Sequence, residues 1–241
     1  MSAFGGKADM VDGADGCWSS WGKKPAGRKP MLRSRLLLPF AAVAAFLVYA
    51  LPSSAETIID EWGSVKSPPA PALHAVTVDP KTTALLVVDV LHQTCNEKRR
   101  PRCVAALPTI KKFLAQARSQ KMLVVYTDVP HTSAADIWPE VAPTPDEPVV
   151  LGILDKFINP DLDKILKAKG IQTIIMVGAA SNGAVLHTAA GAVQRGFKVI
   201  VPVDAVAADN NYIEQYITWD LVNAPVIADK TTLTTTDMIK F

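Results

Sequence analysis

Residues that could take part in catalysis or ligand binding occur in the segment GAASNGAVLHTA, residues 178–189. It follows the apolar run IQTIIMV, which predicts a buried strand, and it opens AVLHTAAGAVQRG, which predicts a helix closed by Gly196. A turn of small residues between a strand and the amino end of a helix exposes free N–H groups and the positive end of the helix dipole. We therefore expect this turn to present a nucleophile or to bind an anion or a carbonyl oxygen.

Other polar side chains follow predicted strands. They are Asp89 after LLVV, Thr127 and Asp128 at the end of VVYTD, and Asp204 at the end of VIVPVD. In a parallel sheet the carboxyl ends of the strands line the ligand crevice. Four apolar residues precede Asp89, so its carboxyl group is expected at the end of a central strand. It could serve there in acid–base chemistry, or it could cap a helix or brace a loop.

His92, three residues after Asp89, and His131 fall in the loops expected to border this crevice. His92 could pair with Asp89 as an acid–base partner or as a metal ligand. One Asp and one His make too small a ligand set for a metal site, and no Cys/His cluster has metal-ligand spacing. No metal is expected.

The composition is that of an ordinary globular protein. The chain has 241 residues, 49% hydrophobic and 20% charged, with a net charge of +2. Such a balance, without a basic stripe interleaved with aromatic residues, argues against nucleic-acid binding. Neither GxGxxG nor a GKT-type phosphate loop occurs, so nucleotide binding has no motif to support it and no cofactor is expected.

An export signal is predicted near the amino end. Residues 31–55 combine Arg33 and Arg35, an apolar run over 36–51, and small residues at 53–55. The run is short for a membrane span, although an uncleaved anchor is the alternative. Residues 1–30 have no usable periodicity and are interpreted as a disordered or mis-started leader. We expect a periplasmic or secreted protein, free of the membrane once the signal is cleaved.

Export would place the cysteines in an oxidising compartment. Cys95 and Cys103 flank a charged segment that contains a proline. A disulfide between them would close a small ring and stabilise the folded state. The alternative is two unrelated buried thiols.

A Pro-rich approach segment, residues 56–80, precedes a single domain over 81–241. Strands are predicted at 83–90, 122–129, 171–178, 197–208 and 224–233, and helices at 104–121, 161–170, 184–196 and 211–224. Residues 130–160 are expected to be irregular. The strands are continuous apolar runs, which indicates a parallel sheet covered on both faces. Right-handed crossovers then give a three-layer α/β/α doubly wound fold.

Together these segments resemble the isochorismatase-like cysteine hydrolase superfamily, which includes nicotinamidases, N-carbamoyl amidohydrolases and isochorismatase. The resemblance rests on LLVVDV, LDKFINPDLDKIL and GIQTIIMVGAASNGAVLHTAAGAVQRGFKVIVPVDAVAA, and it runs from about Thr82 to Ala228. It implies the same three-layer fold, hydrolysis of a small molecule, and assembly into a homo-oligomer in which residues 130–160 could cover a neighbour's pocket.

In the family's hydrolases an Asp activates a Cys thiol, a Lys stabilises charge, and the Cys attacks an amide carbonyl. The resemblance places the Asp at Asp89 and the Lys at Lys156. Lys156 departs from the family spacing because it adjoins Phe157 directly. An exposed Lys156 paired with Asp155 is the alternative.

The family's Cys position falls on Ala184, and a methyl group cannot act as a nucleophile. The resemblance places the oxyanion-binding amides at Ala180 and Ala184, with a cis peptide bond between Ala179 and Ala180. Ser181 lies three residues before the Cys position and would point differently, so we do not expect it to replace the thiol.

Asn182, His187 and His92 complete the candidates for substrate binding. His187 lies about one helical turn after the missing Cys, which would bring it to the same pocket. A packed or solvated role is the alternative for these side chains. Trp138 is expected to pack beneath the irregular stretch.

Isochorismatase itself lacks the Cys and uses its Asp as a general acid, which protonates the enol carbon of a vinyl ether before water adds. The resemblance therefore implies an exported hydrolase of an enol ether or amide, with Asp89 as general acid or base. Such an acid needs a raised pKa, which a nearby Lys156 would oppose. The alternative is an inactive family member that binds a small molecule.

Overall fold

The computed structural model describes residues 57–241. The predicted leader at 1–30 and the predicted signal peptide at 31–55 lie outside the described residues, and the domain boundaries proposed there stay predictions. Residues Glu61–Phe241 form one compact unit. Within residues 57–241, no helix is long and apolar enough to cross a membrane.

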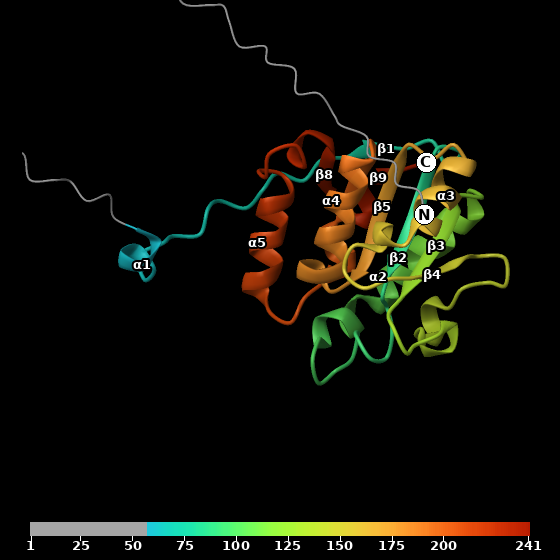
Figure 1. Cartoon of the computed structure of the whole chain (residues 1–241), viewed down its shortest axis with the longest axis horizontal. Coiled ribbons are helices and arrows are strands. Elements are labelled where there is room, and N and C mark those ends of the chain that lie inside the picture. Colours follow the sequence, from blue (N-terminus) through green and yellow to red (C-terminus); the bar gives the residue numbers. More distant parts are fainter. Residues whose placement is uncertain (1–56) are drawn as a thin grey trace, which may run out of the picture. The chain divides into compact units, whose positions relative to one another are not determined.

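The core is a parallel sheet of seven strands (Figure 1). Six of them lie in the order β4-β3-β2-β5-β6-β8, and β7 pairs with β5. The strands are β2 (Thr83–Val88), β3 (Leu123–Asp128), β4 (Val149–Leu151), β5 (Thr173–Ala179), β6 (Lys198–Pro202), β7 (Val206–Ala207) and β8 (Thr231–Thr234).

Helices cover both faces of this sheet, as predicted. One hydrophobic cluster joins α2 (Pro101–Ser119) to one face, and a second joins α3 (Pro160–Ala168), α4 (Leu186–Gln194) and α5 (Asn211–Leu221) to the other. All six residues of β2 are buried, which explains its unbroken apolar sequence. The predicted three-layer α/β/α doubly wound fold is confirmed.

The predicted inner face of α2 is also confirmed, because Ile110, Phe113, Leu114 and Ala117 are all buried. The helix begins earlier than predicted, at Pro101, since proline is favourable in the first turn of a helix.

The chain order of the strands defines where a ligand site should lie. From β2 the chain passes to β3 and β4 on one side, and it then returns to β5 and continues to β6 and β8 on the other. The topological switch point therefore falls between β2 and β5, whose residues pair in register from Thr83 with Thr173 to Val88 with Gly178. Asp89 follows one of these strands and the segment 178–184 ends the other.

Short elements account for most differences from the prediction. The stretch at 130–160 contains β4, and β1 (Val76–Thr77) and β9 (Ile239–Lys240) form a separate two-stranded sheet. The helix α1 (Ile58–Glu61) is a single turn. One-turn 3-10 helices occupy Ala134–Asp136, Pro139–Val141, Lys156–Ile158, Val203–Ala205, Ala228–Lys230 and Thr236–Met238. Elements this short show no periodicity from which a sequence could reveal them.

Candidate active site

Asp89 directly follows β2, and only 3% of its surface is exposed. Its φ of 47° lies in the left-handed region, which Asp tolerates better than most residues do. Thr127, on the neighbouring strand β3, makes two hydrogen bonds to Asp89 through its hydroxyl. The Thr127 hydroxyl donates to Oδ1 of Asp89 at 2.6 Å and accepts from the Asp89 N–H at 3.2 Å. The acid is therefore fixed at the switch point.

Lys156 is fully buried beside this carboxyl group. Its Nζ lies 2.8 Å from Oδ2 of Asp89 and donates to the carbonyl oxygens of Asp128 at 3.1 Å and Gly152 at 2.8 Å. An ammonium group has three N–H donors, and three oxygens surround it here. The alternative of an exposed lysine paired with Asp155 is wrong.

The segment that carries Lys156 is anchored to α4. The Thr188 hydroxyl accepts from the Lys156 N–H and donates to the Leu154 carbonyl, both at 3.2 Å. A Cβ at Gly191, one turn later, would lie 2.5 Å from Oδ1 of Asp155, so this glycine lets the segment pack closely against the helix. Lys156 thereby points inward.

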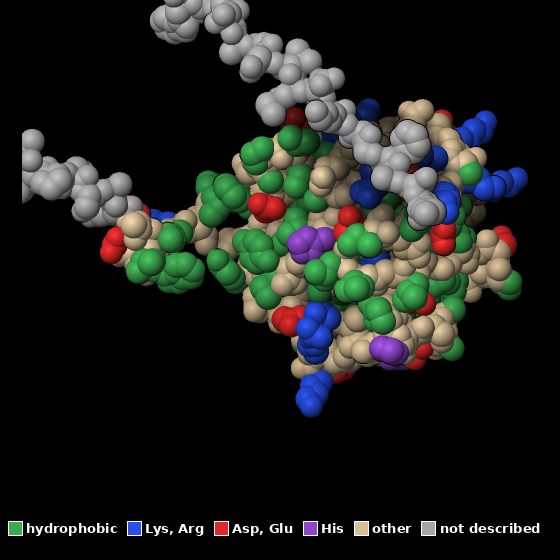
Figure 2. All heavy atoms as spheres, in the orientation of Figure 1, with side chains coloured by type: hydrophobic (Ala, Val, Ile, Leu, Met, Phe, Trp, Pro, Cys, Tyr) green, Lys and Arg blue, Asp and Glu red, His purple; other side chains and the backbone are tan. Residues whose placement is uncertain are grey.

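Several apolar neighbours of Lys156 point outward instead. The exposed ones are Leu151, Ile153, Leu154 and Ile158. Figure 2 shows hydrophobic side chains spread over this face of the molecule among polar and charged ones. The segment 151–158 therefore turns its charge into the protein and leaves apolar groups at the surface.

The sequence analysis named two opposing effects on the pKa of Asp89, burial and a nearby lysine, and both act in the structure. Burial raises the pKa of Asp89, the Lys156 ammonium and the Thr127 hydroxyl lower it, and the Asp128 carboxylate raises it again. Desolvation is the largest of these effects, and the pKa of Asp89 rises to about 6. The adjacent cation therefore does not abolish the protonated form near neutral pH.

The segment after β5 has the backbone form that the resemblance implied. The peptide bond between Ala179 and Ala180 is cis, residues Ser181–Val185 form a π-type turn, and α4 begins at Leu186. The N–H of Ala180 has no backbone acceptor among the described residues. Ala184 is 4% exposed and belongs to the hydrophobic cluster beneath α4. Its methyl group stands where the family's sulfur was expected.

The remaining candidates lie around this centre at different depths. Ser181 is buried with no hydrogen-bond partner for its hydroxyl, Asn182 is half-buried and His187 is exposed. His92 is exposed, and its ring lies 4.3 Å from the ring of Trp138. The structure therefore brings together Asp89, Lys156 and their supports, whereas both histidines face the surface.

The loop after Asp89 is tied down by a disulfide and an arginine. Cys95 and Cys103 are bonded, as the sequence analysis favoured. The Thr94 hydroxyl donates to the Asp89 carbonyl, and Arg100 donates to the Thr94 carbonyl at 2.5 Å. Trp138 packs under this loop, with its indole N–H 2.7 Å from the Cys95 carbonyl.

Asp204 does not join the site. Its carboxylate accepts from the N–H and the hydroxyl of Thr236 at 2.9 and 2.7 Å, so it braces the turn between β8 and β9. The expectation that it lines the crevice is wrong. The chain leaves β6 in a 3-10 turn that directs the side chain away.

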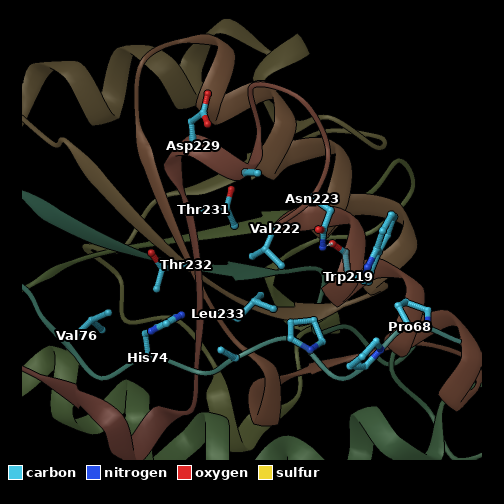
Figure 3. A pocket seen from close by; sticks show the side chains of 14 residues that line it. Pro68, His74, Val76, Trp219, Val222, Asn223, Asp229, Thr231, Thr232 and Leu233 are labelled. Atoms are coloured by element: carbon cyan, nitrogen blue, oxygen red, sulfur yellow. Dashed lines mark hydrogen bonds between the residues drawn. The ribbon is translucent and has the colours of Figure 1, made fainter.

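Two cavities of the described domain lie away from Asp89. Figure 3 shows one of about 760 Å³, lined by Pro68 and His74 of the approach segment and by Trp219 and Thr232. Another, of about 910 Å³, includes Lys81 and Arg118 at the opposite ends of the strands. Neither is lined by Asp89. Within residues 57–241, no three His, Cys, Asp or Glu side chains are placed to hold a metal ion.

An acid and a lysine are buried at the switch point of this doubly wound α/β fold, beside a strand-to-helix turn. Residues 83–231 match the isochorismatase domain family, and the chain belongs to this family.

The chain is 33% identical over 159 residues to a streptothricin hydrolase of Streptomyces noursei, and the match covers 61% of this chain and 53% of the relative. It is 28% identical over 131 residues to a maleamate amidohydrolase of Pseudomonas putida, and this match covers 44% of this chain and 62% of the relative. The chain thus spans little more than half the length of these curated relatives. Among solved structures, an isochorismatase-like hydrolase from Alkaliphilus metalliredigens superposes with a TM-score of 0.58 at 26% identity, covering 65% of this chain and 96% of that one.

Some supports of the site were missed from the sequence. Thr188 and Gly191 lie three residues apart on α4 and face the Lys156 segment. Small residues at this spacing on a helix were the available signal. Thr94 and Arg100 gave no such signal, because their contacts depend on the fold of a loop.

Proposed function

We propose that this protein hydrolyses a small metabolite and that Asp89 exchanges the proton in the reaction. The observation that carries the proposal is the buried Asp89–Lys156 ion pair, in which Asp89 has a pKa of about 6. Membership of the isochorismatase family and hydrolase relatives support it. A carboxyl group with such a pKa suits proton transfer at neutral pH.

Of the two bond types considered, an enol ether fits this site better than an amide does. Ala184 offers no atom that could form a covalent intermediate. Asp89 would donate its proton to the enol carbon, and water would add to the resulting oxocarbenium carbon. The hemiketal would then release the alcohol, and the proton lost from water would return to Asp89. Water is the only molecule consumed.

In this reaction Lys156 would stabilise the carboxylate that Asp89 becomes after it gives up the proton. The N–H groups of Ala180 and Ala184 would bind a carbonyl or alkoxide oxygen of the substrate. Thr127 would hold the carboxyl group in one orientation through both protonation states. These roles are proposals for residues whose positions are described above.

The test is incubation of the protein with isochorismate, other small enol ethers and small amides, including maleamate, followed by mass spectrometry of the products. We expect product from at least one enol ether, and at least a roughly 100-fold loss in Asp89→Asn, which cannot donate the proton. Asp146→Asn changes an exposed carboxylate that is not part of the site. It serves as the control and should retain activity. Equal turnover by Asp89→Asn would refute the role of Asp89.

Ala184 favours a second candidate, a binding protein that has lost turnover. That protein would show a ligand-dependent rise in melting temperature without any product, in the same panel of compounds. Asp89→Asn would then change affinity only.

We further propose export of the protein. The pattern of residues 31–55 and the Cys95–Cys103 disulfide support it, since disulfides persist in oxidising compartments. Sequencing of the mature amino terminus tests this, and a start near Met1 would contradict it. Assembly into a homo-oligomer stays a prediction, which light scattering can test.

A further inference from the structure

Asp128 is a second acid at the same sheet edge, and the proposed chemistry does not use it. It is the last residue of β3, one position beyond the Thr127–Val88 pair, so the register brings it beside Asp89. Only 8% of its surface is exposed, and its Oδ1 is buried with no hydrogen-bond partner. A buried carboxylate oxygen without a donor is rare in folded proteins, which suggests a partner from outside the chain.

The neighbouring cation does not fill this role. Lys156 donates to the main-chain carbonyl of Asp128 rather than to its carboxylate, and its other contacts are Asp89 and Gly152. Both oxygens of Asp89 are already engaged, by Thr127 and by Lys156. Of the two buried carboxyl groups described at this edge, Asp128 is thus the one left to accept a hydrogen bond from a ligand.

The charge balance points to the kind of donor. Two carboxyl groups, on Asp89 and Asp128, lie near the single ammonium of Lys156, and Asp136 adds a further negative charge nearby. The other cation that acts on Asp89, Arg100, is paired with Asp209. Burial raises the pKa of Asp128, the Lys156 ammonium and the N–H of its own backbone lower it, and the Asp136 carboxylate raises it again. A positively charged N–H donor would satisfy the free oxygen and offset the excess negative charge.

The strand order sets the distance between the two parts of the protein that would hold such a ligand. β2 lies between β3 and β5, so Asp128 and the turn after β5 are two strand spacings apart, roughly 10 Å. A carbonyl or enol oxygen held by that turn and an amine two or three bonds away would bridge part of this span, with Asp89 between them.

We propose that Asp128 is a specificity-determining residue that accepts a hydrogen bond from an ammonium group of the substrate. The substrate class is then a small enol ether or carbonyl compound that carries a basic amine. This inference rests on the site of the proposed function, but it concerns binding and does not require turnover.

The test uses three primary amides of similar size that differ in charge. They are 3-aminopropanamide, which is cationic, butanamide, which is neutral, and succinamate, which is anionic. Each is titrated into isotope-labelled full-length protein, and affinity is read from NMR shifts of amide signals at residues 88–90 and 127–129. We expect 3-aminopropanamide to bind about tenfold more tightly than butanamide and succinamate to bind most weakly.

Asp128→Asn should bind the cationic and the neutral amide about equally well, while Asp128→Glu should keep part of the preference for the cation. Asp146→Asn should keep all of it. A preference that survives Asp128→Asn, equal binding of all three compounds, or no binding by 3-aminopropanamide would overturn the inference. Saturable Zn²⁺ binding at Asp128 without any preference among the amides would also overturn it, in favour of a metal.

Absence of product in the turnover screen would leave this result unaffected. The failure of the inference and the failure of the proposed function are therefore distinguishable.

Discussion

Lys156 Nζ lies 2.8 Å from Asp89 Oδ2, and the two side chains expose 0% and 4% of their surface. An ion pair this deep exchanges the hydration of both groups for one contact and a few hydrogen bonds. Its contribution to stability is therefore modest as a pair, whereas an ionised Asp89 without Lys156 would be strongly unfavourable. This asymmetry makes the pair open to a direct energetic test.

Removal of Lys156 alone should destabilise the protein more than removal of both partners. We expect Lys156→Met to lower the free energy of unfolding by about 3–5 kcal/mol well above pH 6, and the double variant with Asp89→Asn to lose less than Lys156→Met does. Asp89→Asn alone should cost little, because the raised pKa of Asp89 means that the fold accepts a neutral group at this position. The loss in Lys156→Met should shrink as the pH falls toward 6 and level off below it, because the pKa of Asp89 lies above 6 in this variant and a proton then neutralises the unpaired carboxylate. Denaturant unfolding of the four proteins measures this, and strict additivity would contradict it.

Gly178 should be intolerant of a side chain. Its φ is 118°, and a Cβ would lie 2.1 Å from the Val88 carbonyl oxygen, at the contact of β5 with β2 beside Asp89. Gly178→Ala should lower the free energy of unfolding by about 2–6 kcal/mol and displace the start of the Asp89 loop.

Gly196 provides the matched control, because its φ of 97° is also positive but a Cβ there meets nothing within 4 Å. Gly196→Ala should cost only about 1–2 kcal/mol, the cost of the conformation itself. Thermal or denaturant unfolding compares the two. An equal loss would show that the close approach of the strands is unimportant.

Ala184→Cys should place a nucleophile at a buried position near the end of the π-type turn. We expect this variant to gain hydrolysis of small amides and to accumulate a covalent acyl adduct, visible by mass spectrometry of the intact protein. Ala184→Ser is the control for size and should gain far less, since a hydroxyl remains protonated near neutral pH. Adding Asp89→Asn should reduce the gain by about 100-fold or more. No adduct with any amide would mean that position 184 does not face the substrate.

Most of the frame of this site could be predicted from the sequence. Asp89 at the end of a buried strand, the turn at 178–184 and the alternation of strands with helices follow from local patterns. These patterns depend on a residue's own neighbours along the chain, which a sequence shows directly.

The partners of these residues could not be predicted in the same way. Whether Lys156 points inward depends on Thr188 and Gly191, which are more than thirty residues away in the chain. The hydroxyl of Thr127 reaches Asp89 only because β2 and β3 are adjacent. Asp204 follows a strand in the same way as Asp89 does, and it nevertheless turns to Thr236. Position at a strand end therefore does not determine the direction of a side chain.

The pH dependence of turnover should report the protonated form of Asp89. If Asp89 acts as a general acid, the activity is constant below about pH 6 and falls about tenfold per pH unit above it. In Lys156→Met the fall should begin at a higher pH, because the cation that favours the carboxylate is gone. Activity that rises through pH 6 would instead assign Asp89 the role of a general base.

The most direct test is an NMR titration of the Asp89 carboxyl carbon, assigned by comparison with Asp89→Asn. The pKa of this group is raised to about 6, with Lys156 and Thr127 opposing the effect of burial. The account predicts a midpoint near pH 6 in the wild type and a higher midpoint in Lys156→Met. A midpoint at or below 3.8, the ordinary value for Asp, would show that Asp89 is a permanent carboxylate and would contradict its role as an acid.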